Sequence, residues 1–302
     1  GIQNAAEQNL VNYATGLNLD QLGALLAVDR LAASSATVTL QFSRSDTTGT
    51  LLIPAGSSAR RSGSAVLYTT DADATINNGQ TSVTVTASAL ATGISGNGFS
   101  IGAIAQLVEV PNGVNAVTNT TASAGGNDPE TDEAFRTRIK LAPNQFSVAG
   151  SKGAYKFHAL SADVSIIDVA VLGPEDRGGA DPVTVDVYPL INDGLPSSLI
   201  LDTVTAALNL DTIRPLTDIV NVAAPTEISY DVTALVTIFD AAEQSTVETG
   251  LTAAINAYTT ERASRLGNDI VLSQIIEALQ SVDGVYSVSL TDPVSSSAVG
   301  LY

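Results

Sequence analysis

The chain has 302 residues, enough for two ordinary domains or three small ones. Its 31 acidic and 13 basic residues give a net charge of −18, which disfavours nucleic acids and anionic membrane surfaces as partners. Cysteine is absent and histidine occurs once, so disulfides, thiolate metal sites, cysteine nucleophiles and sites with two imidazoles are excluded. No run of 18 apolar residues suggests a membrane-spanning helix. The chain opens with Gly1, and we expect its native start to lie upstream.

The N-terminal segment, residues 1–36, is predicted to be helical. Ala5, Ala6, Leu10 and Tyr13 recur at helical spacing until Gly16 interrupts the pattern. A second helix is expected from about Asp20, which would be its N-cap. Its apolar side would carry Leu22, Leu25, Leu26 and Val28.

Residues 37–122 are predicted to form an inserted, β-sandwich-like domain, with a barrel as the alternative. Short alternating segments rich in Thr and Val are separated by turn residues throughout this region. Asn78-Gly79 is typical of a hairpin turn, because both residues tolerate positive φ. The expected strands are 37–42, 51–53, 66–69, 81–86 and 104–110.

Two α+β modules are predicted for the rest, a central one at residues 123–225 and a C-terminal one at 226–302. The first helix would run from Asp128, its N-cap, with Pro129 in the first turn, to about Lys140. Acidic residues begin this helix and basic residues end it, as the helix dipole favours. A capping box at Ser245–Glu248 predicts another helix start. The remaining expected helices are 152–162, one around 201–208 and one around 271–279, and the expected strands are 164–172, 183–188, 219–222, 228–238 and 285–290.

The candidates for chemistry are few, and each has a sufficient structural explanation. Catalysis by a lone histidine needs an orienting acid and a nucleophile or substrate nearby, and His158 lies in a predicted helix beside Tyr155 and Phe157, where a packing or surface role explains it. The pair Asp71 and Asp73 lies in a turn-like stretch. The acidic cluster Asp128, Glu130, Asp132 and Glu133 lacks the ligand spacing of a calcium loop. We therefore expect no catalytic residue, no cofactor and no metal site.

One segment carries a family resemblance. Residues 124–139, Ala-Gly-Gly-Asn-Asp-Pro-Glu-Thr-Asp-Glu-Ala-Phe-Arg-Thr-Arg-Ile, resemble the signature of the baseplate J-like family of contractile phage tails, tailocins and related injection systems. Weaker similarities follow in the same order along the chain, at residues 12–20, 28–30, 53–57, 93–97, 150–159, 194–196 and 214–218. Residues 174–182 depart from the family, since this loop is longer and more charged than usual.

The resemblance implies an α+β multidomain fold with N-terminal helices, an inserted all-β domain and C-terminal α+β modules. It further implies a structural component of a sixfold baseplate wedge in the virion, assembled in the host cytoplasm, and not an enzyme. The implied partners are other copies of the chain, a second wedge protein, and tail hub and sheath proteins, with no nucleic acid and no membrane. Two alternatives stay open at this point, an acidic cell-surface or adhesin-like structural protein and a polysaccharide-degrading tail enzyme.

Arg136 and Arg138 are the candidate interface residues. Phe135 and Ile139 are expected to face the core, and side chains two positions apart diverge by about 200° around a helix. At least one of the two arginines should therefore leave the core side and pair with an acid of this chain or of a neighbour.

Overall fold

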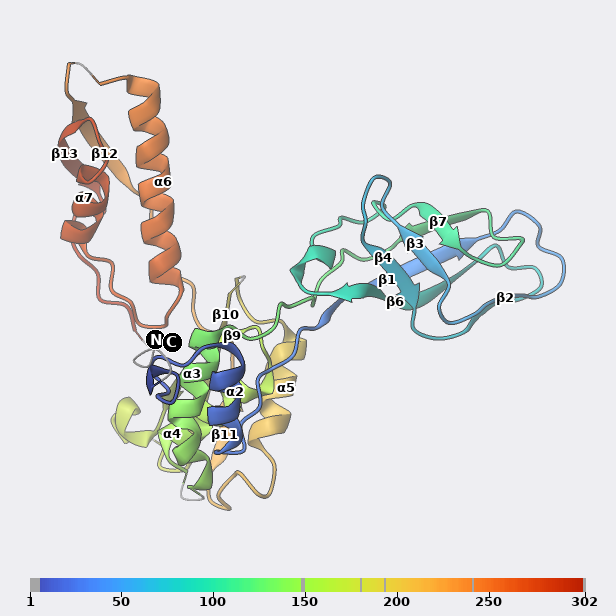
Figure 1. Cartoon of the computed structure of the whole chain (residues 1–302), viewed down its shortest axis with the longest axis horizontal. Helices are drawn as coiled ribbons and strands as arrows, with labels where there is room; N and C mark the ends of the chain where they lie inside the picture. Colours follow the sequence, from blue (N-terminus) through green and yellow to red (C-terminus); the bar gives the residue numbers. More distant parts are fainter. Residues whose placement is uncertain (1–5, 148–149, 180, 193, 241, 301–302) are drawn as a thin grey trace. The chain divides into compact units, whose positions relative to one another are not determined.

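The computed structural model describes residues 6–147, 150–179, 181–192, 194–240 and 242–300 (Figure 1). The chain divides into two compact units, Gly1–Phe135 and Arg136–Tyr302. The first five residues of the predicted N-terminal segment, Ala5 included, and the last two of the predicted C-terminal module lie outside the described residues. In the described ranges, no helix is both long and apolar enough to cross a membrane.

The N-terminal segment contains one substantial helix in its described part, α2 (Gly16–Ala24). Residues 8–13 form turns and bends instead of continuing the predicted first helix. The predicted start at Asp20 is wrong, because α2 begins at Gly16, whose N–H donates to Asp132 Oδ2 at 3.1 Å. The buried side of the helix is also different from the expected one: it carries Leu19 and Gly23, whereas Leu25 is exposed.

A barrel-like sheet follows, and its order is β7-β3-β4-β6-β1-β8. A separate pair of strands, β2 and β5, lies antiparallel beside it in the same unit. The strands are β1 (Ser35–Ser43), β2 (Leu51–Ile53), β3 (Ser58–Arg60), β4 (Leu67–Thr70), β5 (Ala74–Ile76), β6 (Ser82–Thr92), β7 (Gln106–Glu109) and β8 (Ala116–Asn119).

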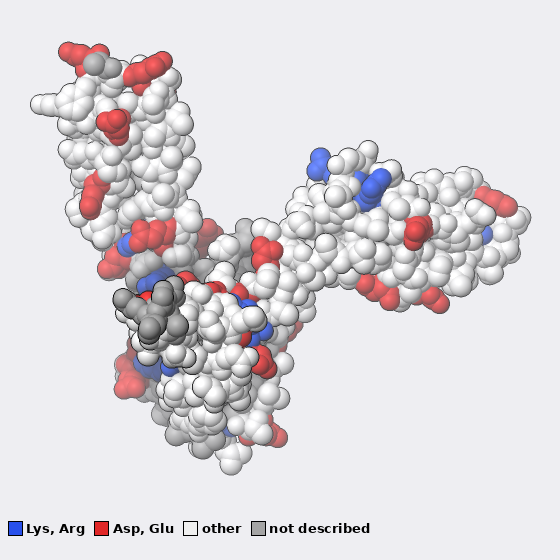
Figure 2. Space-filling model, viewed as in Figure 1, with Lys and Arg blue, Asp and Glu red and all other residues white. Residues whose placement is uncertain are grey.

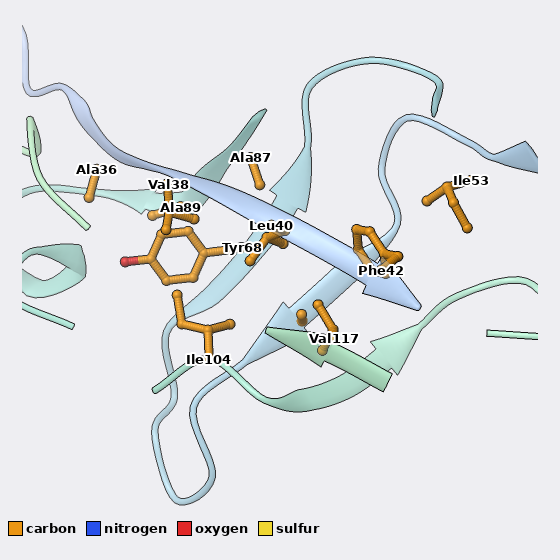
Figure 3. Packing of buried hydrophobic residues seen from close by; sticks show 11 residues of the cluster. Ala36, Val38, Leu40, Phe42, Ile53, Tyr68, Ala87, Ala89, Ile104 and Val117 are labelled. Carbon is orange, nitrogen blue, oxygen red and sulfur yellow. The ribbon is translucent and has the colours of Figure 1, made fainter. Parts of the chain in front are cut away.

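The alternation in β1 builds the core of this barrel. Its buried residues are Ala36, Val38, Leu40 and Phe42, and those between them are more exposed, as expected for a strand with one face on the core. Figure 3 shows these side chains gathered with Tyr68, Ile104 and Val117 from other parts of the barrel. The Tyr68 hydroxyl donates to the carbonyl of Gly96, so the buried phenol is satisfied.

The predicted hairpin at Asn78-Gly79 is only half right. The turn forms, with Gly79 at φ 83°. However, the preceding strand β5 pairs with β2, whereas the following strand β6 pairs with β1 and β4. Turn chemistry set the local bend, and burial of the apolar faces decided which strands pair.

The central part of the second unit is a small sheet with helices packed on it. The order is β11-β10-β9, with β10 parallel to β11 and antiparallel to β9. Its core joins helices and strands through Tyr155, Ala159, Val187, Val204 and Leu208. The elements are α3 (Asp132–Leu141), α4 (Lys152–Ala162), β9 (Ile166–Leu172), β10 (Thr184–Ile191), α5 (Ser198–Leu208) and β11 (Ile219–Val222). The boundary between the two units in the sequence falls within α3.

The C-terminal part pairs β12 (Thr233–Ile238) with β13 (Val285–Asp292), and it contains α6 (Gln244–Ala263) and α7 (Leu272–Gln280). One face of this antiparallel sheet packs against a core of Tyr258, Ile270, Ile275 and Leu279. The predicted capping box is wrong, because the N-cap of α6 is Glu243, two residues before Ser245, and makes no side-chain cap. The predicted fold class, α+β with an inserted all-β domain, is confirmed.

Candidate functional site: the neck of the barrel

The residues first considered for chemistry belong to different units and have ordinary surroundings. His158 is half-buried in α4, with its ring centroid 5.3 Å from that of Phe157. Burial lowers the pKa of His158, because desolvation disfavours the charged imidazolium. Asp71 and Asp73 are exposed, and Asp73 Oδ1 accepts the Ala55 N–H at 2.8 Å. These contacts account for the side chains without a reaction.

The signature segment makes specific contacts with segments far from it in the sequence. It forms the neck, which we define as the outgoing segment 30–37, the returning segment 124–132 and the loop 93–97. All three belong to the first unit. The returning segment pairs antiparallel with the outgoing one through isolated bridges at Ser34–Asn127 and Thr37–Ala124. The neck therefore joins both ends of the inserted barrel to each other.

Asn97 joins the loop to the returning segment. Its Oδ1 accepts the Gly126 N–H at 2.9 Å, and its Nδ2 donates to the Gly126 carbonyl at 2.7 Å. A Cβ at Gly126 would lie 2.4 Å from the Gly93 carbonyl oxygen and 3.0 Å from the Ala36 nitrogen. Only glycine fits between these main-chain atoms, which explains the second glycine of the signature.

Three carboxylates of the acidic cluster make three different sets of hydrogen bonds. Asp128 Oδ1 accepts the Ile94 N–H at 3.1 Å, and buried Glu130 accepts the Leu31 N–H at 3.0 Å. Asp132 accepts from both Gly16 and Arg30. Among the described residues, no group of three or more His, Asp or Glu side chains could hold a metal ion. These carboxylates therefore connect main-chain segments.

Arg30 makes several side-chain contacts in the part of the neck beyond the two bridges. Its Nη2 lies 2.7 Å from Asp20 Oδ1 and 2.7 Å from Asp132 Oδ1, and its Nη1 donates to the Glu130 carbonyl at 2.8 Å. The guanidinium also lies 4.7 Å from the centroid of the Phe135 ring. Burial lowers the pKa of Arg30, but the hydrogen bonds to Asp20 and Asp132 outweigh that effect and raise it, so the side chain stays charged.

The first helix after the barrel starts later than predicted. Asp128 is not its N-cap; α3 begins at Asp132, and Thr131 Oγ1 accepts the Ala134 N–H at 3.3 Å. Pro129 and Glu130 lie before the helix, where Glu130 exchanges hydrogen bonds with Leu31. Contacts that are distant in sequence therefore shortened the helix by one turn.

Arg136 and Arg138 lie in the part of α3 that belongs to the second unit. Their exposed fractions are 7% and 4%, so both side chains are buried. Arg138 Nη1 donates to Ser161 Oγ at 3.0 Å. Since side chains two positions apart point to different sides of a helix, the burial of both means that α3 is covered on more than one side. Their assignment as interface residues stays a prediction.

Sequence reasoning missed several residues of the neck. Arg30 and Asn97 are single polar residues in otherwise ordinary stretches, and their partners lie about 100 and 29 positions away. Only the paired glycines and the acid-rich segment signalled the place, and they were interpreted as a break and a helix start. The pairing itself depends on the closed path of the barrel.

Comparison with protein-family models gives three matches in order along the chain. The baseplate J-like protein barrel domain matches residues 39–126, the baseplate J-like central domain 147–224, and the baseplate J-like protein C-terminal domain 230–298. Together these matches cover most of the chain.

Two individual proteins are also similar. Baseplate protein J of Escherichia phage P2 is 36% identical over 166 residues, which are 55% of this chain and 53% of that protein. The aligned part thus spans about half the length of this curated relative. A chain in the cryo-EM structure of the anti-feeding prophage baseplate, symmetrised sixfold, has a TM-score of 0.48 at 15% identity, and the likeness covers 92% of this chain and 77% of that one.

The three family domains match the order of the folded parts, and the signature segment forms the neck of the first of them. Members of this family are structural components of phage tails. The two alternatives, an adhesin and a polysaccharide-degrading enzyme, are therefore rejected. The chain belongs to the baseplate J-like family, whose members are structural proteins and not enzymes.

Proposed function

We propose that the chain is a wedge component of the baseplate of a contractile tail, assembled around the tail hub in the host cytoplasm. Its partners in this proposal are other copies of itself, a second wedge protein, and hub and sheath proteins. The wedge rearranges when the sheath contracts. The observation that carries the proposal is the succession of three baseplate J-like domains along one chain.

The contacts of the neck support the proposal that the chain carries mechanical load in that assembly. Two bridges, the reciprocal Asn97–Gly126 pair and the Arg30 contacts hold both ends of the barrel together. A domain held by two paired segments transmits a load through several hydrogen bonds at once, whereas a single linker would yield. A component that must survive sheath contraction benefits from such a connection.

The proposal is tested by deleting the gene in a contractile-tailed phage that carries it and complementing it in trans. Without the chain, we expect tails that lack baseplates in negative-stain electron microscopy and no infective particles. The wild-type chain should restore both, and so should His158→Ala and the double change Asp71→Ala/Asp73→Ala, because neither site has a chemical role. Complete baseplates and normal infectivity in its absence would overturn the proposal.

The rearrangement has its own measurement. Cross-linking mass spectrometry on extended and on contracted tails should give different cross-links between this chain and sheath or hub proteins. An identical set of cross-links in both states would contradict this part of the proposal, and the structural role would stand without it.

A further inference from the structure

The barrel carries its exposed positive charge in one place. Arg44, Arg60 and Arg61 are the only basic residues between positions 31 and 135. Arg44 is buried, and its guanidinium donates to the carbonyls of residues 47, 48, 49, 77 and 80, so it contributes little to the surface. Arg60 and Arg61 remain, at the end of β3.

These two arginines belong to a surface whose side chains are held by contacts within the barrel. We call it the arginine patch and define it as Arg60, Arg61, Phe99 and Val108. Arg61 lies 5.8 Å from the centroid of Phe99, and Phe99 packs edge-on against the buried Tyr68. Arg60 Nε donates to Gln106 on the paired strand β7, where Val108 is exposed. No carboxylate in the described part of the chain pairs with either guanidinium. The patch combines fixed positive charge with apolar area.

The C-terminal part presents the opposite combination. The face of the β12–β13 sheet turned away from its core exposes Leu235 by 71%, Phe239 by 54% and Tyr286 by 62%. The two aromatic rings meet edge to face, with centroids 5.3 Å apart. Exposed aromatic pairs of this kind are typical of protein–protein contacts.

Two carboxylates border that aromatic pair. The Phe239 N–H donates to the Gly284 carbonyl at 3.0 Å, which brings the neighbouring residues Asp240 and Asp283 to the same end of the sheet. We call Leu235, Phe239, Tyr286, Asp240 and Asp283 the sheet-tip surface. Between residues 226 and 300 the only basic residues are Arg262 and Arg265, at the other end of α6, about 27 Å along the helix.

Figure 2 shows two basic groups close together on one side of the barrel and a small further one at its far end, whereas acidic side chains without basic ones occupy the end of the C-terminal part where α6 begins. Two sheet-tip surfaces would repel each other, since each carries two unpaired negative charges beside its aromatic pair. The arginine patch, by contrast, matches the sheet-tip surface in both charge and apolar character.

We propose that the sheet-tip surface of one copy of the chain docks on the arginine patch of the next copy. The two surfaces differ, so the contact is heterologous, and repetition of such a contact closes a ring when the rotation allows. The proposal rests on the proposed function, in which several copies surround the tail hub, and it names the surfaces by which those copies meet. Arg60 and Arg61 pair with Asp240 and Asp283, while Phe99 and Val108 cover Phe239 and Tyr286.

The absence of native cysteine allows a direct test by disulfide trapping. Ser62→Cys lies beside the arginine patch and Ser287→Cys beside Tyr286, both at exposed positions. Two differently tagged proteins, one with each change, are mixed and oxidised, and the mixed dimer is quantified. We expect Ser62→Cys to trap Ser287→Cys at least about tenfold more than it traps the control Ser198→Cys, which is exposed on α5. Equal yields would overturn the proposal.

Charge exchange gives the second arm. In the trapping background, Arg60→Glu/Arg61→Glu should reduce the yield about tenfold or more, and adding Asp240→Arg/Asp283→Arg on the partner should restore it. The individual double variants should nearly keep the melting temperature of the parent, because Arg61, Asp240 and Asp283 are exposed and Arg60 is only partly buried. Failure of the exchange to restore trapping would refute the pairing.

The same variants in the phage separate this inference from the proposed function. We expect Arg60→Glu/Arg61→Glu to abolish baseplates and the four-residue exchange to restore them. If the first variant assembles normal baseplates that contain the chain, the docking surfaces are wrong and the wedge role stands. If the wild-type chain is itself absent from baseplates, the proposed function fails.

Discussion

At the scale of single residues, Gly126 and Arg30 determine which main-chain segments come together. Gly126 lets three main-chain segments approach within contact distance, and Arg30 satisfies carboxylates and a carbonyl from segments about 100 positions apart. Neither residue contributes apolar area. Their effect is to determine which segments meet, and small changes there should cost more than their size suggests.

Gly126→Ala tests the close approach. The added Cβ would lie 2.4 Å from a carbonyl oxygen that belongs to the main chain, so the neck must shift, and we expect a loss of about 1–3 kcal/mol in the free energy of unfolding. Gly173→Ala is the matched control, because its Cβ would meet neighbours only at 3.8 and 3.9 Å and its backbone is extended. Urea titration of both variants decides; equal stability would show that the neck absorbs the methyl group.

Phe135→Ala tests the ring under Arg30. Phe135 is fully buried, and its ring would lie 2.5 Å from a Cβ placed on Gly23, so the aromatic side chain fills the space beside α2. We expect a loss of about 3–5 kcal/mol, as for other buried aromatic truncations. Thermal and urea unfolding measure it, and a loss under about 1 kcal/mol would mean that the site collapses around the cavity.

The burial of Arg138 changes what its charge reversal should do. An exposed arginine could be replaced by glutamate with little effect on the monomer, but Arg138 is buried and bonded to Ser161. Arg138→Glu should therefore lower the stability of the isolated chain by more than about 2 kcal/mol. Arg61→Glu, at an exposed position, should leave the melting temperature unchanged. A parental melting temperature for Arg138→Glu, together with failed baseplate assembly, would return Arg138 to an interface role.

His158 should make the stability depend on pH in a defined direction. Its pKa in the folded chain lies below the ordinary 6.5 because burial penalises the imidazolium. The unfolded chain then binds more protons, so the contribution is intact above pH 6.5 and is lost as the pH falls through 6.5 towards the folded pKa. Melting temperatures should fall between about pH 7.5 and 5.5. His158→Gln should flatten this part of the profile; an unchanged slope would place the titrating group elsewhere.

Secondary-structure elements followed local sequence preferences wherever nothing distant competed with them. The helix predicted at 152–162 occurs with the same bounds as α4, capped by Ser151, and the strand predicted at 219–222 is β11. The start of α3 departs from its prediction because Glu130 bonds to Leu31, a partner supplied by the barrel's path. The cap of the helix is therefore Thr131, three residues after the predicted N-cap Asp128.

Thr131 is the element-scale test of this start. Thr131→Ala should cost about 1 kcal/mol, the usual loss of an N-cap, because Thr131 Oγ1 accepts the Ala134 N–H and the residue is otherwise exposed. Thr131→Ser keeps the hydroxyl and should stay within about 0.5 kcal/mol of the parent. Thermal unfolding of the two variants distinguishes them. If alanine and serine behave alike, the hydroxyl does not cap the helix.

The whole molecule consists of two compact units, and the first includes a barrel with its own core. The division into segments 1–36, 37–122, 123–225 and 226–302 stays a prediction. Three of the four residues in the bridges, Ser34, Ala124 and Asn127, lie outside the predicted range of the inserted domain. The stable piece should therefore be slightly longer than the one predicted.

Two fragments test the autonomy of the barrel. Residues 34–127 include the bridges and the Asn97–Gly126 pair, whereas residues 37–122 lack them. We expect both fragments to unfold cooperatively, with the longer one melting several degrees higher, since about 1 kcal/mol shifts a domain of this size by about 4–8 °C. Circular dichroism and proton NMR give the answer. A disordered longer fragment would mean that the barrel depends on the rest of the chain.

The sequence by itself determined the elements with strong periodicity, the all-β character of the inserted region, the absence of disulfides and the family resemblance. Each depends on composition or on neighbours within a few positions, where side-chain preferences act directly. The tertiary structure alone decided that β5 leaves the predicted hairpin for β2, that α3 starts at Asp132, and that Arg136 and Arg138 are both buried. These outcomes depend on groups far apart in sequence competing for the same hydrogen bonds and the same buried space, and that competition is settled only when the chain is folded.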